Sequence, residues 1–290
     1  MQLSFRKILD LPLGIGESPV WDHRSEKLWF IDIAGPTIYA CRHDGTELVA
    51  YAASSSVGSL GLAGETGLVV ALRNEVALFE PSTGAWRKLA DIEADIASNR
   101  TNDGAVGPDG AFWMGTMFEW PPYEPSASFY RIAPDGEVDR IVGGLHVSNG
   151  LAWSPDGKRM YHADSIIPQI NAYEFDATNG LASAPARWAA FPSEVGHPDG
   201  GAVDAEGCYW SAGVSAGRLN RFAPDGKLVE QFELPCLFPT MPCFGGPDLS
   251  SLYLTSMSRD DEVGGLFVAE AGVRGLPSYV FGEGGPRQAL

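Results

Sequence analysis

The sequence predicts an all-β protein, a six-bladed β-propeller built from four-stranded antiparallel blades. Two observations lead to this prediction: the chain of 290 residues holds 35 glycines and 21 prolines, and one two-strand pattern recurs six times along it. Glycine and proline at this density favour many turns and short strands over long helices. With 44% hydrophobic residues, the chain is long enough to bury a large core.

The recurring unit is an apolar strand, a tight polar turn often spelled Pro-Asp-Gly or Glu-Gly, and a second strand with a central aromatic or aliphatic residue. These central residues are Trp29, Val69, Trp113, Tyr161, Trp210 and Tyr253. The successive intervals of 40, 44, 48, 49 and 43 residues match the roughly 40–50 residues of a four-stranded propeller blade. We therefore expect one propeller domain over residues 1–290, with two non-repeating β-sandwiches as the alternative.

Each unit continues into a second hairpin, as a four-stranded blade requires. The predicted second hairpins begin at Thr37, Glu75, Ser128, Ile170, Arg218 and Gly265. Their turn residues stand where a short loop needs a positive φ or an Asx turn. The segment from Leu3 to Leu11 has no blade of its own, so we expect it to pair with the last blade and close the ring.

The net charge and the cysteine content indicate which classes of partner the protein can bind and in which cellular compartment it is expected. A net charge of −17 repels phosphate backbones and anionic membrane surfaces, which argues against nucleic acid and membrane partners. No apolar run reaches the roughly 18–20 residues of a membrane helix, and no signal-peptide core follows the segment Met1–Lys7. The four cysteines form no C-x-x-C pair and are expected to be buried thiols. We expect a cytoplasmic monomer or weak homodimer.

Polar side chains recur at one position of the repeat. Four residues before the central residue of each first strand stand Glu17, Gly58, Asn102, Asn149, Asp199 and Met241. Equivalent positions of propeller blades lie at the same height around the channel, so the four polar side chains are expected to converge at one mouth. Carboxylate and amide oxygens suit Ca²⁺, Mg²⁺ or Mn²⁺. The pattern predicts a divalent metal site.

The run Asn99–Asp103 enters the third unit beside this predicted site. Arg100 is expected to lie within reach of a ligand, because its planar guanidinium suits carbonyl, carboxylate or hydroxyl groups. Asp103 is expected to accept hydrogen bonds from backbone amides of a loop. The match Gly213–Gly217 to G-x-S-x-G lacks the strand-turn-helix context of a catalytic serine, so Ser215 is interpreted as a turn residue.

At this point the chain resembles the family of regucalcin (senescence marker protein), gluconolactonase and luciferin-regenerating enzyme. The resemblance rests on the segments Gly16–Trp21, Asn99–Gly104, Gly115–Met117, Ser148–Gly157, Pro198–Gly200, Asp204–Gly207 and Phe244–Leu249. It implies a six-bladed propeller with a divalent metal held by Glu17, Asn149 and Asp199. It further implies that Arg100, Asn102 and Glu119 contact the substrate.

The resulting hypothesis is a lactonase, a carboxylic-ester hydrolase that opens a sugar-acid lactone. One divalent metal ion, Ca²⁺ first and Zn²⁺, Mn²⁺, Mg²⁺ or Fe²⁺ next, would polarise the ester carbonyl and activate a water, while Asp199 takes the proton. Arg100 and Asn102 would hold sugar hydroxyls and developing negative charge. The alternatives are hydrolysis of other esters or organophosphates at the same site, a non-enzymatic Ca²⁺-binding regulator, and an interaction scaffold.

Overall fold

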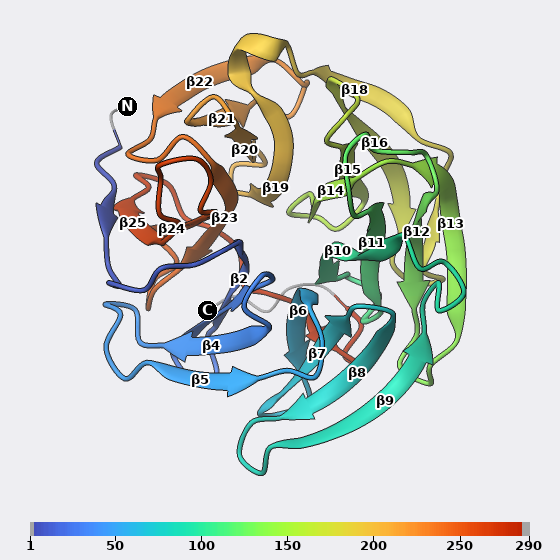
Figure 1. Ribbon diagram of the computed structural model, residues 1–290. Helices are drawn as coiled ribbons and strands as arrows, with labels where there is room; N and C mark the ends of the chain where they lie inside the picture. The colour runs from blue at the N-terminus through green and yellow to red at the C-terminus, as the bar shows by residue number, and fades with distance from the viewer. Residues whose placement is uncertain (1–2, 286–290) are drawn as a thin grey trace.

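The computed structural model describes residues 3–285 and confirms the predicted six-bladed β-propeller. Six sheets stand around a central channel, each with one strand innermost (Figure 1). The alternative of two β-sandwiches is therefore wrong. The predicted domain of residues 1–290 also includes residues 1–2 and 286–290, which lie outside the described residues.

Blades 1 to 3 follow one another along the first half of the chain. Blade 1 consists of β2 (Gly16–Asp22), β3 (Lys27–Asp32), β4 (Thr37–Cys41) and β5 (Val49–Ala52). Blade 2 consists of β6 (Val57–Ala63), β7 (Gly67–Leu72), β8 (Glu75–Glu80) and β9 (Ala85–Asp91), with β26 (Val280–Phe281) added at its inner edge. Blade 3 consists of β10 (Asn99–Val106), β11 (Phe112–Phe118), β12 (Ala127–Ile132) and β13 (Val138–Leu145).

Blades 4 to 6 complete the ring. Blade 4 consists of β14 (Ser148–Trp153), β15 (Arg159–Asp164), β16 (Gln169–Asp176), β17 (Leu181–Ala182) and β18 (Ala186–Ala190). A 3₁₀ turn, η1 (Ser193–Val195), leads to blade 5, which consists of β19 (His197–Val203), β20 (Tyr209–Val214), β21 (Arg218–Phe222) and β22 (Leu228–Glu233). Blade 6 consists of β23 (Pro239–Gly245), β24 (Ser251–Ser256), β25 (Leu266–Glu270) and β1 (Arg6–Lys7).

The N-terminal segment closes the ring, as the sequence predicts. Arg6 and Lys7 pair antiparallel with β25, opposite Val268 and Phe267. The strand is shorter than the predicted segment from Leu3 to Leu11. It supplies the fourth strand of blade 6, so the last blade to be synthesised is completed by the first residues of the chain.

The second hairpin predicted from Gly265 onward is wrong. β25 is the third strand of blade 6, and because β1 occupies the edge beside it, the following segment cannot pair there. The segment instead leaves the blade, and β26 pairs parallel with β6 of blade 2, with Val280 opposite Leu62. The C-terminal segment therefore links the last blade to the second one.

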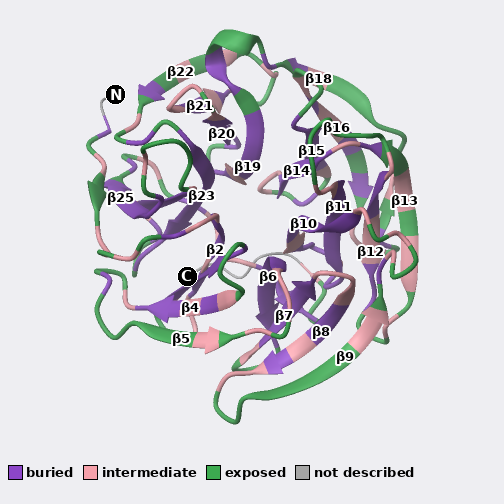
Figure 2. Cartoon of the chain, viewed as in Figure 1, coloured by how far each residue is buried: buried purple, intermediate pink, exposed green. Residues whose placement is uncertain are grey.

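Each pair of neighbouring blades shares a hydrophobic cluster, so the six clusters follow the ring. Trp113 and Trp153 pack between blades 3 and 4, and Trp210 packs on Phe244 between blades 5 and 6. The inner strands are buried, whereas the outermost strands β5 and β9 are largely exposed and β13 and β22 are partly exposed (Figure 2). Burial of this apolar surface is the main force that holds the blades together.

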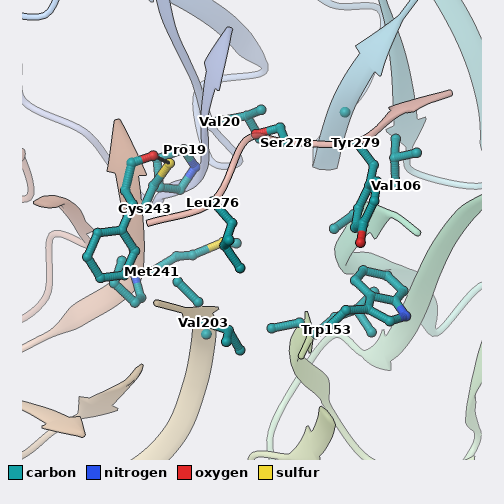
Figure 3. Close-up of a pocket in the computed structure, with 18 of the residues that line it drawn as sticks. Pro19, Val20, Val106, Trp153, Val203, Met241, Cys243, Leu276, Ser278 and Tyr279 are labelled. Atoms are coloured by element: carbon teal, nitrogen blue, oxygen red, sulfur yellow. Dashed lines mark hydrogen bonds between the residues drawn. The ribbon is translucent and has the colours of Figure 1, made fainter. Parts of the chain in front are cut away.

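The channel narrows to an apolar cavity of about 120 Å³ on the side of the C-terminal segment. Figure 3 shows Met241, Val203 and Trp153 from three inner strands around it, with Leu276 and Ser278 of the C-terminal segment crossing beside them. This part of the channel has no titratable side chain other than Cys243 and Tyr279 among its described lining residues. The polar groups of the channel therefore lie toward its other end. Within residues 3–285, no helix has the length and apolar character needed to cross a bilayer.

Candidate metal centre and active site

A β-bulge interrupts the inner strand of every blade at the same end of the channel. In β2, β6, β10, β14, β19 and β23, the inner strand has one residue more than its partner at this point. A bulge bends the strand and re-aims the side chains beside it. Glu17 and Asn149 stand directly before their bulges, whereas Asn102 and Asp199 are the first residues within theirs. Each of the four nevertheless lies three residues before the residue that pairs with the central residue of the second strand, so they hold one repeat position and only the start of the bulge shifts by one residue.

A chain of hydrogen bonds fixes the amide side chains at this mouth. Nη1 of Arg100 donates to Oδ1 of Asn102 at 2.9 Å, and Nδ2 of Asn102 donates to Oδ1 of Asn149 at 3.2 Å. Nδ2 of Asn149 donates to the hydroxyl of Ser165 at 2.8 Å, and that hydroxyl donates to the carbonyl of Pro198 at 2.7 Å. The chain runs from blade 3 to blade 5 and fixes which atom of each amide is its oxygen.

Three carboxyl groups are buried together at the same mouth: Glu17, Asp103 and Asp199. Burial raises the pKa of Glu17 well above its usual range, and the charges of Asp199 and Asp103 raise it further. Burial also raises the pKa of Asp199 to about 8, with an added effect of Asp103. The positive charge of Arg100 lowers both pKa values. Because buried like charges repel one another, this cluster favours a bound proton or cation.

Asp103 accepts a backbone hydrogen bond, as the sequence predicts, but from strand β14 and not from a loop. Its Oδ2 accepts a hydrogen bond from the amide of Leu151 at 2.9 Å, which ties blade 3 to blade 4. Burial raises the pKa of Asp103 to about 6, although such backbone hydrogen bonds lower it. Its Oδ1 is buried and has no hydrogen-bond partner among the described residues. A buried carboxylate oxygen without a partner is costly, which is a second reason to expect a cation nearby.

The donor atoms at this mouth fit a divalent cation. Glu17 and Asp199 offer carboxylates, and Asn149 offers an amide oxygen whose orientation is fixed by Ser165. All of these donors are oxygens, the ligands that Ca²⁺, Mg²⁺ and Mn²⁺ prefer. Two carboxylates balance the charge of such an ion. The three predicted ligands are thus brought together with the predicted substrate contacts Arg100 and Asn102.

Glu119, the third predicted substrate contact, lies near enough to Arg100 for their charges to interact, and it is paired with a residue that the sequence analysis did not single out. Nη1 and Nη2 of Arg73 donate to its two carboxylate oxygens at 2.9 and 2.5 Å. Hydrogen bonding to Arg73 holds the pKa of Glu119 below its usual range, and the charge of Arg100 lowers it further. Arg73 directly follows β7, which ends at this mouth. Its place after that strand is the one sequence feature that could have indicated a role at the site.

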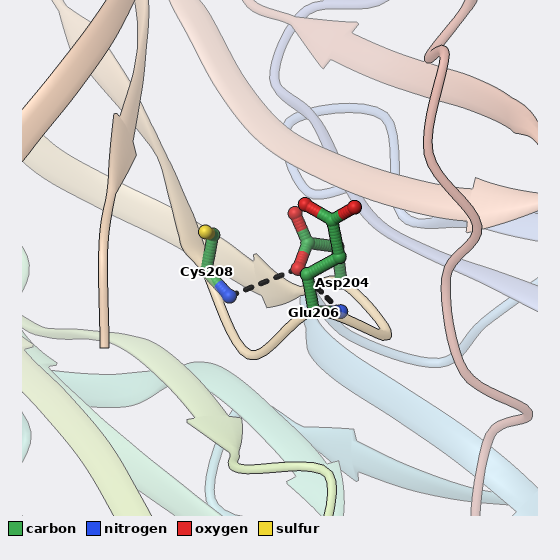
Figure 4. Close-up of side chains that lie close together, drawn as sticks. All are labelled: Asp204, Glu206 and Cys208. Carbon is green, nitrogen blue, oxygen red and sulfur yellow. Dashed lines mark hydrogen bonds between the residues drawn. The ribbon is translucent and has the colours of Figure 1, made fainter.

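A second acidic cluster lies in the turn between β19 and β20, where ligand atoms of Asp204, Glu206 and Cys208 come within 4.8 Å of one another (Figure 4). Oδ1 of Asp204 already accepts the amides of Glu206 and Cys208 at 3.0 and 2.9 Å. Its Oδ2 accepts Nε1 of Trp210 at 2.9 Å and Nη2 of Arg221 at 2.8 Å. The guanidinium of Arg221 thus takes the place that a cation would need.

The same arrangement recurs in blade 3. Oδ1 of Asp109 accepts Nε1 of Trp113 at 3.0 Å, and its Oδ2 accepts Nε of Arg131 at 2.8 Å. In both blades, a carboxylate thus binds the indole of a tryptophan and the guanidinium of an arginine from the same blade, so this contact is a repeated structural feature of the propeller. We therefore interpret the Asp204 cluster as a structural contact within blade 5, and we place the candidate metal centre at the channel mouth.

Comparison with known proteins identifies the family of this chain. The family described as the SMP-30/Gluconolactonase/LRE-like region matches residues 15–258, a span that includes all six bulged inner strands. The chain belongs to this family. The family resemblance predicted from the sequence is thereby confirmed, and its motifs Gly16–Trp21, Asn99–Gly104 and Ser148–Gly157 prove to be bulge segments.

Relatives within the SMP-30/gluconolactonase family cover nearly the whole chain. A 6-deoxy-6-sulfogluconolactonase of Pseudomonas putida is 33% identical over 262 residues, which are 90% of this chain and 89% of that protein. Regucalcin of Xenopus laevis is 32% identical over 286 residues, with 92% and 94% of the two chains covered. The crystal structure of a calcium-binding regucalcin from Agrobacterium tumefaciens has a TM-score of 0.92 at 26% identity and covers 97% of this chain and 98% of its own.

Proposed function

We propose that the protein is a metal-dependent lactonase that opens a sugar-acid lactone. One observation carries the proposal: buried carboxyl groups of Glu17 and Asp199 meet, at one channel mouth, the hydrogen-bonded chain from Arg100 through Asn102 to Asn149. A cation site beside a buried, oriented guanidinium can bind a polar ester and stabilise negative charge on it. Neither a scaffold nor a simple ion store requires that combination.

The family relationship supports the same reaction class. The relative from Pseudomonas putida is named a sulfogluconolactonase, an enzyme for a sugar-acid lactone, and the Agrobacterium tumefaciens regucalcin is described as calcium-binding. We therefore assign to this chain a sugar lactone as substrate and one divalent cation as cofactor, with Ca²⁺ first. Glu17, Asn149 and Asp199 would hold the cation. Bound there, it would supply Lewis acidity toward the ester carbonyl.

Asp199 is the proposed proton acceptor. A water adds to the carbonyl carbon of the lactone while a carboxylate oxygen of Asp199 takes its proton. The ring carbon–oxygen bond then breaks, the proton passes to the departing ring oxygen, and the product is an open-chain hydroxy acid. Asp199 must be ionised to act in this way. Its pKa of about 8 in the cation-free protein falls when positive charge is placed beside it.

Arg100 and Asn102 are the proposed groups for orientation and charge stabilisation. Arg100 uses Nη1 for the carbonyl of Thr101 and for Asn102, both at 2.9 Å. Its other N–H groups are thereby fixed in direction and remain available for the substrate. Glu119 can accept hydrogen bonds from sugar hydroxyls at the rim. These side chains select a polyhydroxylated lactone over an apolar ester.

A panel of aldonolactones tests the proposal. Ring opening is followed by acid release after removal of metal and after add-back of Ca²⁺, Mn²⁺, Zn²⁺, Mg²⁺ or Fe²⁺. We expect turnover that is lost with the metal and restored by at least one ion. Metal binding without turnover of any lactone would instead assign the protein as a calcium-binding regulator. Turnover of aryl esters or organophosphates alone would keep the site and change the substrate.

A further inference from the structure

Arg73 and Glu119 form an ion pair between two blades at the channel mouth. Arg73 follows β7 of blade 2, and Glu119 follows β11 of blade 3. The two guanidinium nitrogens and the two carboxylate oxygens meet in parallel, at 2.9 and 2.5 Å. This fork-to-fork geometry fixes the plane of the carboxylate as well as its distance. A lysine could not hold it in the same way.

The main chain of Arg73 is held as firmly as its side chain. Its carbonyl accepts a hydrogen bond from the amide of Thr101 at 3.0 Å, and its amide donates to the hydroxyl of Ser55 at 3.2 Å. Arg73 is therefore anchored beside Thr101, the neighbour of Arg100. The ion pair therefore lies beside β10, the strand that carries the proposed substrate contacts Arg100 and Asn102.

A third charge completes the group. Arg100 is buried close to the ion pair, and burial lowers its pKa while the carboxylate of Glu119 opposes that effect. The charge of Arg73 acts on Arg100 in the opposite sense to Glu119. Glu119 thus interacts with two guanidinium groups and is hydrogen-bonded to that of Arg73. Which arginine it contacts decides whether Arg100 is free for the substrate.

Stability does not explain this arrangement. The side chains of Arg73 and Glu119 are 32% and 22% exposed, and ion pairs that remain in contact with solvent contribute only about 0–1 kcal/mol. Other pairs of the chain, such as Arg42 with Glu47 at 3.0 Å, are of this ordinary kind. The Arg73–Glu119 pair differs from these because both of its charges act on the buried Arg100.

We propose that Arg73 is a positioning residue of the substrate site: it holds Glu119 away from Arg100, so that the carboxylate and the buried guanidinium both face the substrate. The proposal rests on the proposed lactonase function. When Arg73 is removed, Glu119 turns to Arg100, the nearest remaining cation, and the two groups neutralise each other. Substrate binding then weakens although Asp199 and the metal ligands are untouched.

A double-mutant cycle tests this role. We expect Arg73→Met to raise KM for gluconolactone about tenfold, the effect of roughly 1.4 kcal/mol, with kcat changed less than threefold. Arg73→Lys should recover part of the loss. In a Glu119→Gln background, Arg73→Met should have less than a twofold further effect, because the neutral amide no longer competes for Arg100. An equal effect of Arg73→Met in both backgrounds would overturn the proposal.

A second readout does not depend on turnover. The pKa of Glu119 is measured by NMR titration of the protein with ¹³C-labelled glutamate carboxyl groups. Arg73→Met alone should raise this pKa only slightly, since Arg100 replaces Arg73 as its partner. The double variant Arg73→Met with Arg100→Met should raise it to the ordinary range of a glutamate. A pKa of Glu119 that is unchanged in both variants would overturn the proposal. The matched control Arg42→Met should leave the kinetics and this pKa as in the unaltered protein.

These two readouts separate the positioning role from the lactonase function. If the unaltered protein opens no lactone, the proposed function fails, and the carboxyl titration together with equilibrium binding of gluconate still decides the role of Arg73. Gluconate binding that is weakened about tenfold by Arg73→Met, but not in the Glu119→Gln background, would support it. Gluconate binding that Arg73→Met leaves unchanged would contradict it.

Discussion

Nδ2 of Asn102 donates a hydrogen bond to Oδ1 of Asn149 at 3.2 Å, across the interface between blades 3 and 4. The same nitrogen donates to the carbonyl of Ser148 at 2.9 Å, and Oδ1 of Asn102 accepts from Arg100. One side chain therefore orients both a proposed substrate contact and a proposed metal ligand. Substrate binding and metal binding are expected to be coupled through it.

Replacement of Asn102 by alanine tests this coupling. Asn102→Ala removes the donor that turns the amide of Asn149, and loss of an outer partner of this kind costs about 10–100-fold in metal affinity. We expect the affinity for Ca²⁺, measured by isothermal titration calorimetry, to fall within that range together with a raised KM.

The matched control for this substitution is Asn171→Ala. Asn171 accepts a hydrogen bond from Gln169 at 2.9 Å on strand β16, so its loss removes an amide contact away from the mouth. Unchanged metal affinity is expected there. Equal losses in the two variants would show that Asn102 acts through general stability and not through Asn149.

Metal binding is expected to release protons. Without a cation, the pKa of Asp199 is raised to about 8, so Asp199 binds a proton below that pH. The pKa of Glu17 is raised well above its usual range, so Glu17 keeps its proton to a higher pH than an ordinary glutamate does. A cation must displace these protons, and its affinity should rise about tenfold per pH unit for each proton released. Titrations at pH 6 and pH 8 in buffers of different ionisation enthalpy measure this. Proton release that persists unchanged in Asp199→Asn would contradict it, and Asp204→Asn is the matched control.

The metal-free protein is expected to lose stability as the pH rises. Asp199 has a pKa of about 8 in the folded state and about 3.9 in an unfolded chain. Between these values the folded state binds more protons, so the free energy of unfolding decreases with pH. At pH 8, Asp199→Asn should therefore have a higher Tm than the unaltered metal-free protein. The exposed Asp156→Asn should not, and a lower Tm for Asp199→Asn would refute the stated charge repulsion.

The Asp204 cluster is expected to matter for folding and not for metal. Asp204 is fully buried whereas the side chain of Arg221 is 12% exposed, and loss of a hydrogen-bond partner from a buried polar group costs about 1–3 kcal/mol. Arg221→Met should lower the free energy of urea unfolding by that amount and leave one metal per chain. Arg131→Met, which unpairs Asp109, should act in the same direction. A changed metal stoichiometry in Arg221→Met would move the metal site to blade 5.

The blade count could be predicted from the sequence because each blade is a local structure. Turn residues and strand patterns such as those around Trp113 and Trp210 repeat within about 50 residues, so the period is visible in the chain. The four polar side chains of the channel mouth were also predictable, since equivalent blade positions lie at one height. The bulges were not predictable, and their start differs by one residue between the strand of Glu17 and the strand of Asp199.

Contacts between distant segments escaped the sequence analysis for a physical reason. Arg73 and Glu119 lie 46 residues apart on neighbouring blades, and only the packing of blade 2 against blade 3 brings them together. Val280 pairs with Leu62 because β1 already occupies the edge of blade 6. Neither contact has a local sequence pattern, so both depend on how the blades pack in the folded ring.

Ring opening by Asp199→Asn in metal-saturated protein is the most direct test of the channel mouth as a lactonase site. The amide keeps an oxygen for the cation and cannot take the proton of the attacking water. We predict that kcat for gluconolactone falls about 10²–10⁴-fold, while Ca²⁺ remains bound at one per chain. A kcat within twofold of the unaltered protein, with the metal in place, would contradict the proposed function of Asp199.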